Sequence, residues 1–392
     1  MKLHGNFDTS IQQLLDCMND DTRFISDWNK GADVLNFDLS KLELFSEYHI
    51  NSNSYFFSDE FHSLKENYAP ITMTQGLCKK LEPDRFSVVS NCTIAGYLST
   101  YYVKKKHGKI RAILLAPTYF TYIQVLQDLG AEIFYIHCYN NPNLLHELYK
   151  IVANNPINMI IVTEPLFGTG VSLERSILTK IKEMCEEQRI YLLVDYAYGG
   201  MLWEDMDGLQ DAFFLNFARS KYVMLITSIC KRLFINGIKH GIIIANPEII
   251  KTIEHISVYT VGCLSEQQII LYKRLHSVSC YPLLIESVHR NNRHHKANFE
   301  LMSTTLSNTC FDISSCNCGY FCLVGIPIKR PQSSMVIAKR IMEMTNILTI
   351  PHDRYIFDCS TRYYFRVNLA VSQDQLLTLI STLSQTYFDG IN

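Results

Sequence analysis

The stretch from Ile190 to Tyr198 reads IYLLVDYAY and places a carboxylate at the end of an apolar run. Such a run, without polar interruptions, is typical of a buried central strand in a parallel sheet. A carboxylate at the end of that strand costs free energy unless a cation pairs with it. A protonated pyridine nitrogen is one such cation. The simpler alternative is that Asp195 caps the helix that follows.

A lysine follows the next apolar run. Residues Tyr222–Thr227 read YVMLIT; Ser228 comes directly after them, Lys231 three positions later, and Lys239 eight positions beyond Lys231. Burial and a nearby cation lower the pKa of a lysine and favour the free amine, which can attack a carbonyl and form a Schiff base. The hydroxyl of Ser228 and the charge of Lys239 both suit a phosphate. Taken alone, Lys231 is better explained as a surface lysine.

From about residue 86, short β-branched and apolar runs alternate with longer amphipathic stretches, which indicates βαβ units and an α/β fold. The predicted strands are Phe86–Ser90, Arg111–Ala116, Glu132–His137, Met159–Thr163, Ile190–Asp195, Tyr222–Thr227 and His240–Ala245. The predicted crossover helices are Thr93–Lys106, Thr121–Leu129, Asn143–Asn155 and Leu173–Gln188. We therefore expect a seven-stranded, mainly parallel sheet with helices on both faces and ligands at the carboxyl ends of its strands.

The pattern changes after about residue 250. A long helical region reaches about Glu300; two strand-like runs follow, CGYFCLVGIPI and YYFRVNLAV, separated by a helix around Val336–Met344. We expect a large domain over residues 51–270 and a smaller α+β domain over residues 271–392. The first 50 residues, which hold an apolar helix pattern near Ile11–Cys17, are expected to pack on the smaller domain.

Composition narrows the possible partners. The chain has 392 residues, 47% of them hydrophobic, and a formal net charge of −2, which gives no overall field to attract nucleic acid or a membrane surface. No apolar run reaches the roughly 18 residues of a membrane span. Thirteen scattered cysteines and the lack of a signal-peptide pattern predict a reducing, cytoplasmic setting. Cys316, Cys318 and Cys322 lack a second ligand pair at zinc spacing, so no metal is predicted.

The residues after the strands share one family pattern. Asp195-x-x-Tyr198, Ser228-x-x-Lys231 and Lys239, in this order and at these intervals, resemble the core of the class I and II aminotransferases. These are fold type I enzymes that use pyridoxal 5′-phosphate (PLP). The resemblance implies that Lys231 carries PLP as a Schiff base, that Asp195 faces its ring nitrogen and that Tyr198 bonds to its ring oxygen. Ser228 and Lys239 would hold the phosphate.

Earlier segments extend the resemblance. SNCTIAGY at residues 90–97 is similar to the family's Ser-Gly-Ala-Thr turn, which assigns phosphate binding by helix N-terminal amides to Cys92 and Thr93. APTYFTY at 116–122 is similar to the segment whose aromatic residue stacks on the pyridine ring, which is then Tyr119. Tyr68 in KENYAPIT resembles the tyrosine that a neighbouring subunit lends to the phosphate, so a homodimer is expected.

The segment YYFRVNLAVS resembles the family's Phe-Arg-x-x-x-Ala pattern, whose arginine binds the α-carboxylate of the amino-acid substrate through a bidentate pair. The resemblance assigns this role to Arg366. Arg362 lies on the same strand with the same parity, but only Arg366 fits the pattern.

Two positions depart from the family. The asparagine that donates to the cofactor's ring oxygen in ordinary members falls on Phe167 of EPLFGTG, which cannot donate, and Lys239 replaces the usual arginine. The segment IVTEPLFGTGVSL also resembles the α-oxoamine synthases, although those usually have a histidine where this chain has Tyr198. The leading hypothesis is an aminotransferase that moves an amino group to a 2-oxo acid. The alternatives are a PLP-dependent lyase, cyclase, replacement or condensing enzyme, and a non-catalytic protein of the same fold.

Overall fold

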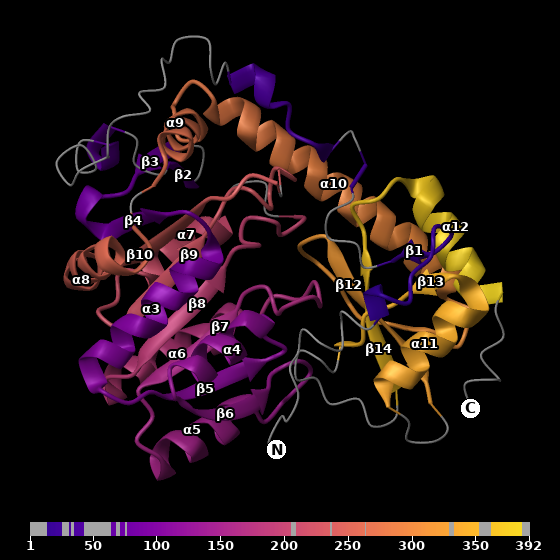
Figure 1. Cartoon of the computed structure of the whole chain (residues 1–392), viewed down its shortest axis with the longest axis horizontal. Helices are drawn as coiled ribbons and strands as arrows, with labels where there is room; N and C mark the ends of the chain where they lie inside the picture. The colour runs from indigo at the N-terminus through magenta and orange to yellow at the C-terminus, as the bar shows by residue number, and fades with distance from the viewer. Residues whose placement is uncertain are drawn as a thin grey trace.

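The computed structural model describes residues 14–25, 31–32, 35–42, 64–67, 71–74, 77–204, 209–235, 237–262, 264–328, 333–352 and 362–385. Their centre is a seven-stranded sheet with the order β4-β10-β9-β8-β7-β5-β6 (Figure 1). Its strands are β4 (Phe86–Val89), β5 (Arg111–Ala116), β6 (Glu132–His137), β7 (Met159–Thr163), β8 (Tyr191–Tyr196), β9 (Val223–Thr227) and β10 (Gly241–Ala245). β10 is antiparallel to both neighbours and the other pairs are parallel. The predicted sheet is confirmed.

Helices cover both faces of this sheet, as the α/β pattern predicts. One face carries α3 (Cys92–His107), α4 (Phe120–Asp128) and α8 (Pro247–Thr260). The other carries α5 (Leu144–Asn154), α6 (Arg175–Gln188), α7 (Leu209–Phe217) and α9 (Glu266–Leu275). Every residue of β7 and β8 is buried, because these central strands have helices on both sides.

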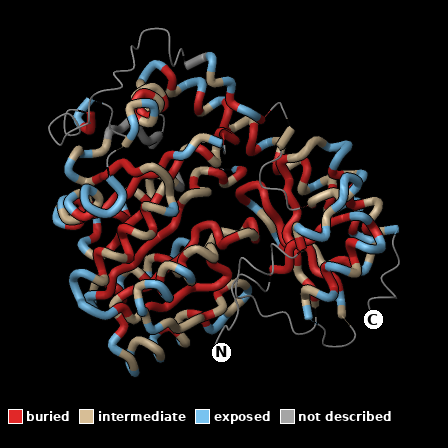
Figure 2. The backbone as a smooth tube through the Cα atoms, in the orientation of Figure 1, coloured by how far each residue is buried: buried red, intermediate tan, exposed pale blue. Residues whose placement is uncertain are grey.

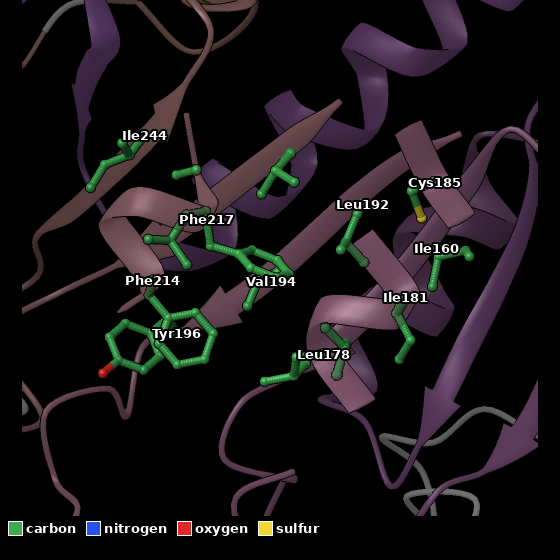
Figure 3. Packing of buried hydrophobic residues seen from close by; sticks show 14 of the residues in the cluster. Ile160, Leu178, Ile181, Cys185, Leu192, Val194, Tyr196, Phe214, Phe217 and Ile244 are labelled. Carbon is green, nitrogen blue, oxygen red and sulfur yellow. The ribbon is translucent and has the colours of Figure 1, made fainter. Parts of the chain in front are cut away.

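Side-chain alternation along β8 explains how both faces are filled. Leu192 and Val194 point toward α6 and α7, where they meet Leu178 and Phe214 (Figure 3). Leu193 points the other way, into the cluster beneath α3 and α8. Burying one such leucine completely stabilises the fold by about 1.5–3 kcal/mol. The same alternation fixes which side chains at the end of β8 reach each face.

A second, smaller sheet lies at the other end of the molecule (Figures 1 and 2). It contains β11 (Asp312–Ile313), β12 (Phe321–Pro327) and β14 (Arg362–Asn368), all antiparallel. α11 (Ser334–Thr345) and α12 (Gln373–Gln385) cover it, and the short β1 (Arg23–Phe24) pairs with β13 (Ile347–Leu348) beside it. The hairpin β2 (Ile71–Thr74) and β3 (Leu77–Lys80) and the 3-10 helices at Leu39–Leu42 and Pro83–Arg85 complete the described elements.

The division into domains at residues 50 and 270 stays a prediction. Leu14 and Ile25 lie in the apolar cluster of the smaller sheet. Leu35 belongs to a separate cluster that includes Phe234 and Phe321, between the two sheets. The boundary at residue 270 falls inside α9, whose buried face packs on the large sheet.

One long helix joins the two sheets. α10 (Tyr281–Leu306) has 26 residues and runs from the end of α9 to the smaller sheet (Figure 1). Asn291 on this helix donates to the carbonyl of Arg232 (3.0 Å), next to the predicted lysine. Asn298 donates to the carbonyl of Leu369 (2.8 Å), just beyond β14. Both residues are fully buried and lie in the middle of α10, so their amides hold this part of the helix to backbone rather than to solvent.

Two further observations concern the described residues as a whole. None of their helices combines the length and apolar character needed to cross a bilayer. No three histidine, cysteine or acidic side chains among them gather where a metal ion could be held. Cys316 directs its thiol to the carbonyl oxygens of Cys318 (3.6 Å) and Phe321 (3.5 Å), which packs this cysteine-rich segment against β12.

The turn after β7 is organised by a buried acid. Glu164 accepts hydrogen bonds from the hydroxyl of Ser172 and from the amide of Leu173 (3.1 Å), which closes residues 164–173 into a compact loop. Burial raises the pKa of Glu164 to about 8, although both hydrogen bonds lower it. Glu164 therefore keeps its proton in the folded protein near neutral pH.

We expect the wild-type protein to lose stability relative to Glu164→Gln as the pH rises from 4.5 to about 8. The unfolded chain loses the Glu164 proton near its ordinary pKa of 4.5, whereas the folded chain keeps it up to about 8. The folded state then binds more protons, so its stability falls with rising pH, by at most about 1.4 kcal/mol per pH unit. Urea unfolding of both proteins across this range measures the difference.

Glu132→Gln is the control. Hydrogen bonds from Lys109 and Arg111 lower the pKa of this exposed carboxylate, so its contribution has the opposite sign and lies below pH 4.5. A constant difference in stability between wild type and Glu164→Gln over pH 4.5–8 would contradict the assignment.

Candidate functional site

Asp195 lies at the carboxyl end of β8, with its side chain on the face covered by α3 and α4. The carboxylate is buried and accepts hydrogen bonds from the hydroxyl of Tyr122 (2.9 Å) and from the amide of Ala197 (3.1 Å). Burial raises the pKa of Asp195, and these two hydrogen bonds lower it in part. A cation placed beside the carboxylate would favour its charged form. The alternative that Asp195 caps a helix does not apply, because no helix begins within residues 196–204, the described segment that follows it.

The predicted lysine lies on a tight turn after β9. Ser228 is buried, and its hydroxyl accepts from the amide of Cys230 (3.2 Å), while the amide of Ile235 donates to the carbonyl of Cys230 (3.0 Å). Lys231 is half-buried, and its Nζ lies 5.6 Å from the centre of the Tyr198 ring. These local bonds hold the lysine next to the strand that ends in Asp195.

Tyr198 connects the two sheets. Its hydroxyl accepts from the hydroxyl of Tyr320 (3.4 Å), and its ring lies 6.5 Å from that of Phe321. Burial raises the pKa of Tyr198, so the phenol is neutral and can donate a hydrogen bond. The charge of Lys231 acts in the opposite direction on this pKa. A neutral phenol beside an amine is suited to tuning the protonation of that amine or of a group bound to it.

The beginning of α3 lies at the same edge of the sheet. Asn91 caps the helix by accepting from the amide of Ile94 (2.9 Å), and Cys92 is its first residue. The Cys92 thiol lies 3.8 Å from the carbonyl oxygen of Thr227, which immediately precedes Ser228. The first amides of a helix have no acceptor within the helix and form a ready site for an anion.

A glycine allows β10 to pack closely against the start of α3. Gly241, the first residue of β10, packs so closely on the start of α3 that a Cβ atom would lie 2.6 Å from the carbonyl carbon of Asn91. It would also lie 2.9 Å from the amide nitrogen of Cys92. Real Cβ atoms essentially never come so close to backbone, so the approach of strand to helix requires glycine.

Aromatic side chains form one wall of the site. Tyr119 directs its amide toward the hydroxyl of Thr163 (3.4 Å), and its ring lies 5.3 Å from Phe167 and 6.1 Å from Tyr122. Because Tyr122 in turn donates to Asp195, the wall joins the buried carboxylate to the loop after β7. Such rings present flat apolar faces to a bound planar group.

Arg366 approaches from the smaller sheet. It is buried on β14, and its guanidinium carbon lies 5.4 Å from the centre of the Phe167 ring and 4.7 Å from that of Phe321. Burial and the nearby Arg366 lower the pKa of His352 to about 3, so this histidine is neutral near neutral pH. The arginine is therefore the cation on this side of the site, held between two aromatic rings.

The structure brings most of the predicted site residues into one connected group. Contacts run from Lys231 through Tyr198 and Phe321 to Arg366, and from there through Phe167 and Tyr119 toward Asp195. Thr93 and Lys239 are exposed, and Tyr68 lies outside the described residues. The functional roles of all these side chains stay predictions.

Sequence reasoning missed two members of the group. Tyr122, the partner of Asp195, lies three residues after Tyr119 within the quoted APTYFTY, and that helical spacing was the available signal. Phe321 contacts Arg366 because β12 and β14 pair in antiparallel register, with Leu323 opposite Arg366. The register was not visible in the sequence.

The sequence is similar to those of several known enzymes. Among curated proteins, a 1-aminocyclopropane-1-carboxylate synthase from Arabidopsis thaliana is 23% identical over 203 residues, and an aspartate aminotransferase from Pyrococcus horikoshii is 21% identical over 255. The matches cover 46% and 61% of this chain. They cover 43% and 59% of those proteins, so the chain spans about half the length of the curated relatives it matches.

Solved structures support the fold. A methionine aminotransferase from Escherichia coli superposes with a TM-score of 0.76 at 13% identity, covering 98% of this chain and 97% of that one. A PLP-dependent aminotransferase from Streptococcus suis gives 0.73 at 18% identity, over 100% and 99%. Both share the fold type I architecture predicted here.

The family model for aminotransferase class I and II matches residues 51–383. The chain therefore belongs to the family of class I and II aminotransferases.

Proposed function

We propose that this protein is a PLP-dependent aminotransferase that transfers the amino group of an amino acid to a 2-oxo acid. The observation that carries the proposal is the placement of Lys231 beside Tyr198, next to the strand that ends in the buried Asp195. Arg366 faces this group from the smaller sheet. An amine, a buried acid and a carboxylate-binding cation are the side chains that amino-acid chemistry on PLP requires.

The residues present fit PLP at three points. A ring cation would offset the burial that raises the pKa of Asp195. The start of α3, narrowed by Gly241 and lying beside Ser228, would accept a phosphate. Tyr119 would cover one face of the ring. Lys239 is exposed, so we assign it to the outer side of the phosphate.

Bound there, PLP would supply an aldehyde for covalent capture of the amino acid and a sink for the electrons left when the Cα proton departs. The residues of this chain do the remaining work. Lys231 would hold the cofactor and then serve as the base that takes the proton from Cα and delivers it to the cofactor carbon that carried the aldehyde. Tyr198 donates a hydrogen bond, and Arg366 orients the substrate through its α-carboxylate.

Phe167 determines how Arg366 can bind a carboxylate. The rings of Phe167 and Phe321 lie 5.4 Å and 4.7 Å from the guanidinium carbon and so help to position the group, whose N–H edge is the part that would meet a carboxylate. That edge is where the bidentate donors lie. A phenylalanine at the usual asparagine position thus gives up one hydrogen bond to the cofactor and gains a contact that holds the arginine in place.

A second candidate is elimination or cyclisation by the same residues. Two curated relatives are named 1-aminocyclopropane-1-carboxylate synthases, from Arabidopsis thaliana and Solanum lycopersicum. The lack of a hydrogen-bond donor at Phe167 also favours elimination or cyclisation, because this lack changes the contacts of the cofactor ring.

We also propose a homodimer, in which each subunit lends Tyr68 to the other, and a cytoplasmic location.

Product analysis separates the two candidates. Purified protein loaded with PLP should convert a suitable L-amino acid and a 2-oxo acid into a new 2-oxo acid and a new amino acid, detected by mass spectrometry across a substrate panel. Lys231→Ala should lower this rate by on the order of 10²–10⁴, because the base and the covalent anchor are removed. Borohydride treatment should no longer tether PLP to the variant.

Lys296→Ala is the matched control, since Lys296 is an exposed lysine of α10 paired with Glu204 (2.9 Å). It should keep both activity and tethering. Release of a leaving group or formation of a ring would favour the second candidate. PLP tethered to Lys231→Ala would show that another lysine carries the cofactor.

Gly241→Ala should weaken PLP binding by on the order of tenfold, about 1.4 kcal/mol. The new methyl group would separate β10 from the start of α3 and displace the amides that hold the phosphate. The dissociation constant is measured by titrating cofactor-free protein with PLP. Gly237→Ala is the control in the same segment, because a Cβ atom there meets nothing within 4 Å. Equal affinities of the two variants would exclude this phosphate site.

Arg366→Lys should weaken binding of the amino acid by about 1.5–3 kcal/mol, the range for hydrogen bonds to charged groups. Lysine keeps the charge but loses the planar fork. PLP affinity should stay the same, because the arginine lies on β14, away from the start of α3. Steady-state kinetics with a PLP titration checks both. Arg362→Lys, at the exposed end of the same strand, is the control; loss of PLP instead of substrate would give Arg366 a structural role.

A further inference from the structure

Arg232, the residue after Lys231, forms an ion pair on the face of the large sheet that α7 covers. The side chain of Asp195 lies on the other face. Arg232 contacts Asp211 of α7 through two bonds, from Nη1 to Oδ2 (2.7 Å) and from Nη2 to Oδ1 (3.1 Å). The two side chains are only 17% and 22% exposed. Paired in this bidentate geometry, the guanidinium has little freedom to move, and neither does the turn that carries it.

The residue after the predicted aspartate joins the same pair. Tyr196 follows Asp195 on β8, so its side chain points to the other face, where its ring packs on Phe214 (Figure 3). Its hydroxyl donates to Oδ1 of Asp211 (2.9 Å) and accepts from the amide of Gly200 (2.9 Å). Asp211 therefore binds the strand ends that carry Asp195 and Lys231 at the same time.

The guanidinium is also enclosed by backbone. Gly200 has a positive φ of 68°, and a Cβ atom there would lie 2.5 Å from Nη1 of Arg232. The other side of the group faces the Tyr196 ring, 5.7 Å from its centre. The carbonyl of Arg232 accepts from Asn291 of α10 (3.0 Å), so both ends of this residue are fixed.

We propose that Asp211, Arg232 and Tyr196 are positioning residues that set the placement of Lys231 relative to Asp195. None of the three side chains reaches the face where the cofactor would lie, so they act only through the backbone of the two strand ends. The inference rests on the proposed function for its catalytic consequence, but the tether itself is a property of the cofactor-free chain. A turn released from Asp211 would leave the lysine amine misplaced, and misplacement by about 1 Å can cost on the order of 100-fold in rate.

The tether is tested first without cofactor. Hydrogen exchange of the cofactor-free protein should show the amides of Cys230, Leu233 and Ile235 exchanging on the order of tenfold faster in Arg232→Gln than in wild type. Asp211→Asn should have the same effect, and Arg232→Lys a smaller one. Arg111→Gln, which breaks the exposed ion pair between Arg111 of β5 and Glu132 of β6 (3.3 Å), should leave the exchange of these amides unchanged. Unchanged exchange in Arg232→Gln would overturn the tether.

The catalytic consequence is tested with PLP bound. Arg232→Gln should lower kcat by on the order of 10- to 100-fold while KM for the amino acid changes by less than about threefold, because Arg366 is untouched. The visible circular dichroism of the bound cofactor should change in the same variant, and Arg232→Lys should restore part of both. Combining Arg232→Gln with Asp211→Asn should cost no more than either alone.

The two hypotheses fail in different ways. If wild type forms no 2-oxo acid, the proposed function fails while the exchange result still decides on the tether. Faster exchange together with wild-type kcat and dichroism would overturn the positioning role. A raised KM with unchanged kcat would overturn it too, since the effect would then lie in substrate binding.

Discussion

The site depends on one buried carboxyl group. Asp195 lies near the carboxyl end of β8, in which every residue is buried, and among the described residues a tyrosine hydroxyl and one amide donate hydrogen bonds to it. Such an arrangement is unfavourable in isolation and becomes favourable when a cation binds. In the function proposed here, the free energy that the fold gives up to bury Asp195 would be recovered when a ligand with a positive ring nitrogen binds.

The aromatic residues divide the site into one part around Asp195 and another around Arg366. On the side of the large sheet, Tyr119 and Tyr122 surround the carboxylate and exclude water from it. On the side of the smaller sheet, Phe167 and Phe321 enclose the guanidinium of Arg366. In both parts, rings lower the local dielectric around a charge and thereby strengthen its attraction to the opposite charge of a ligand. A single phenylalanine, Phe167, touches both parts through Tyr119 and Arg366.

The sequence was informative where local pattern decides structure. Each strand of the large sheet follows from a run of apolar residues. The places of Asp195, Ser228 and Lys231 after two of those strands indicated them as candidates, whereas the resemblance to the aminotransferase family assigned most of the other site residues. What depends on tertiary pairing was not accessible. α7 was not predicted, because LQDAFFLNF lacks a clear polar face, and so the partner of Arg232 had no predicted element to lie on. Phe321 was missed because its contact with Arg366 is set by strand register, which a single sequence leaves open.

The long helix α10 sets a fixed spacing between two buried asparagines. Asn291 and Asn298 are seven residues apart, two turns, so they lie on the same side of the helix about 10 Å from each other. One binds the backbone beside Lys231 and the other the backbone beyond Arg366. The spacing between the backbone beside Lys231 and the backbone beyond Arg366 is thus set by the pitch of a single helix. Moving one of these asparagines by one position along the helix would rotate its amide by about 100° away from its backbone acceptor. The helix can therefore hold the backbone near Lys231 and the backbone near Arg366 in register without contact between the two side chains.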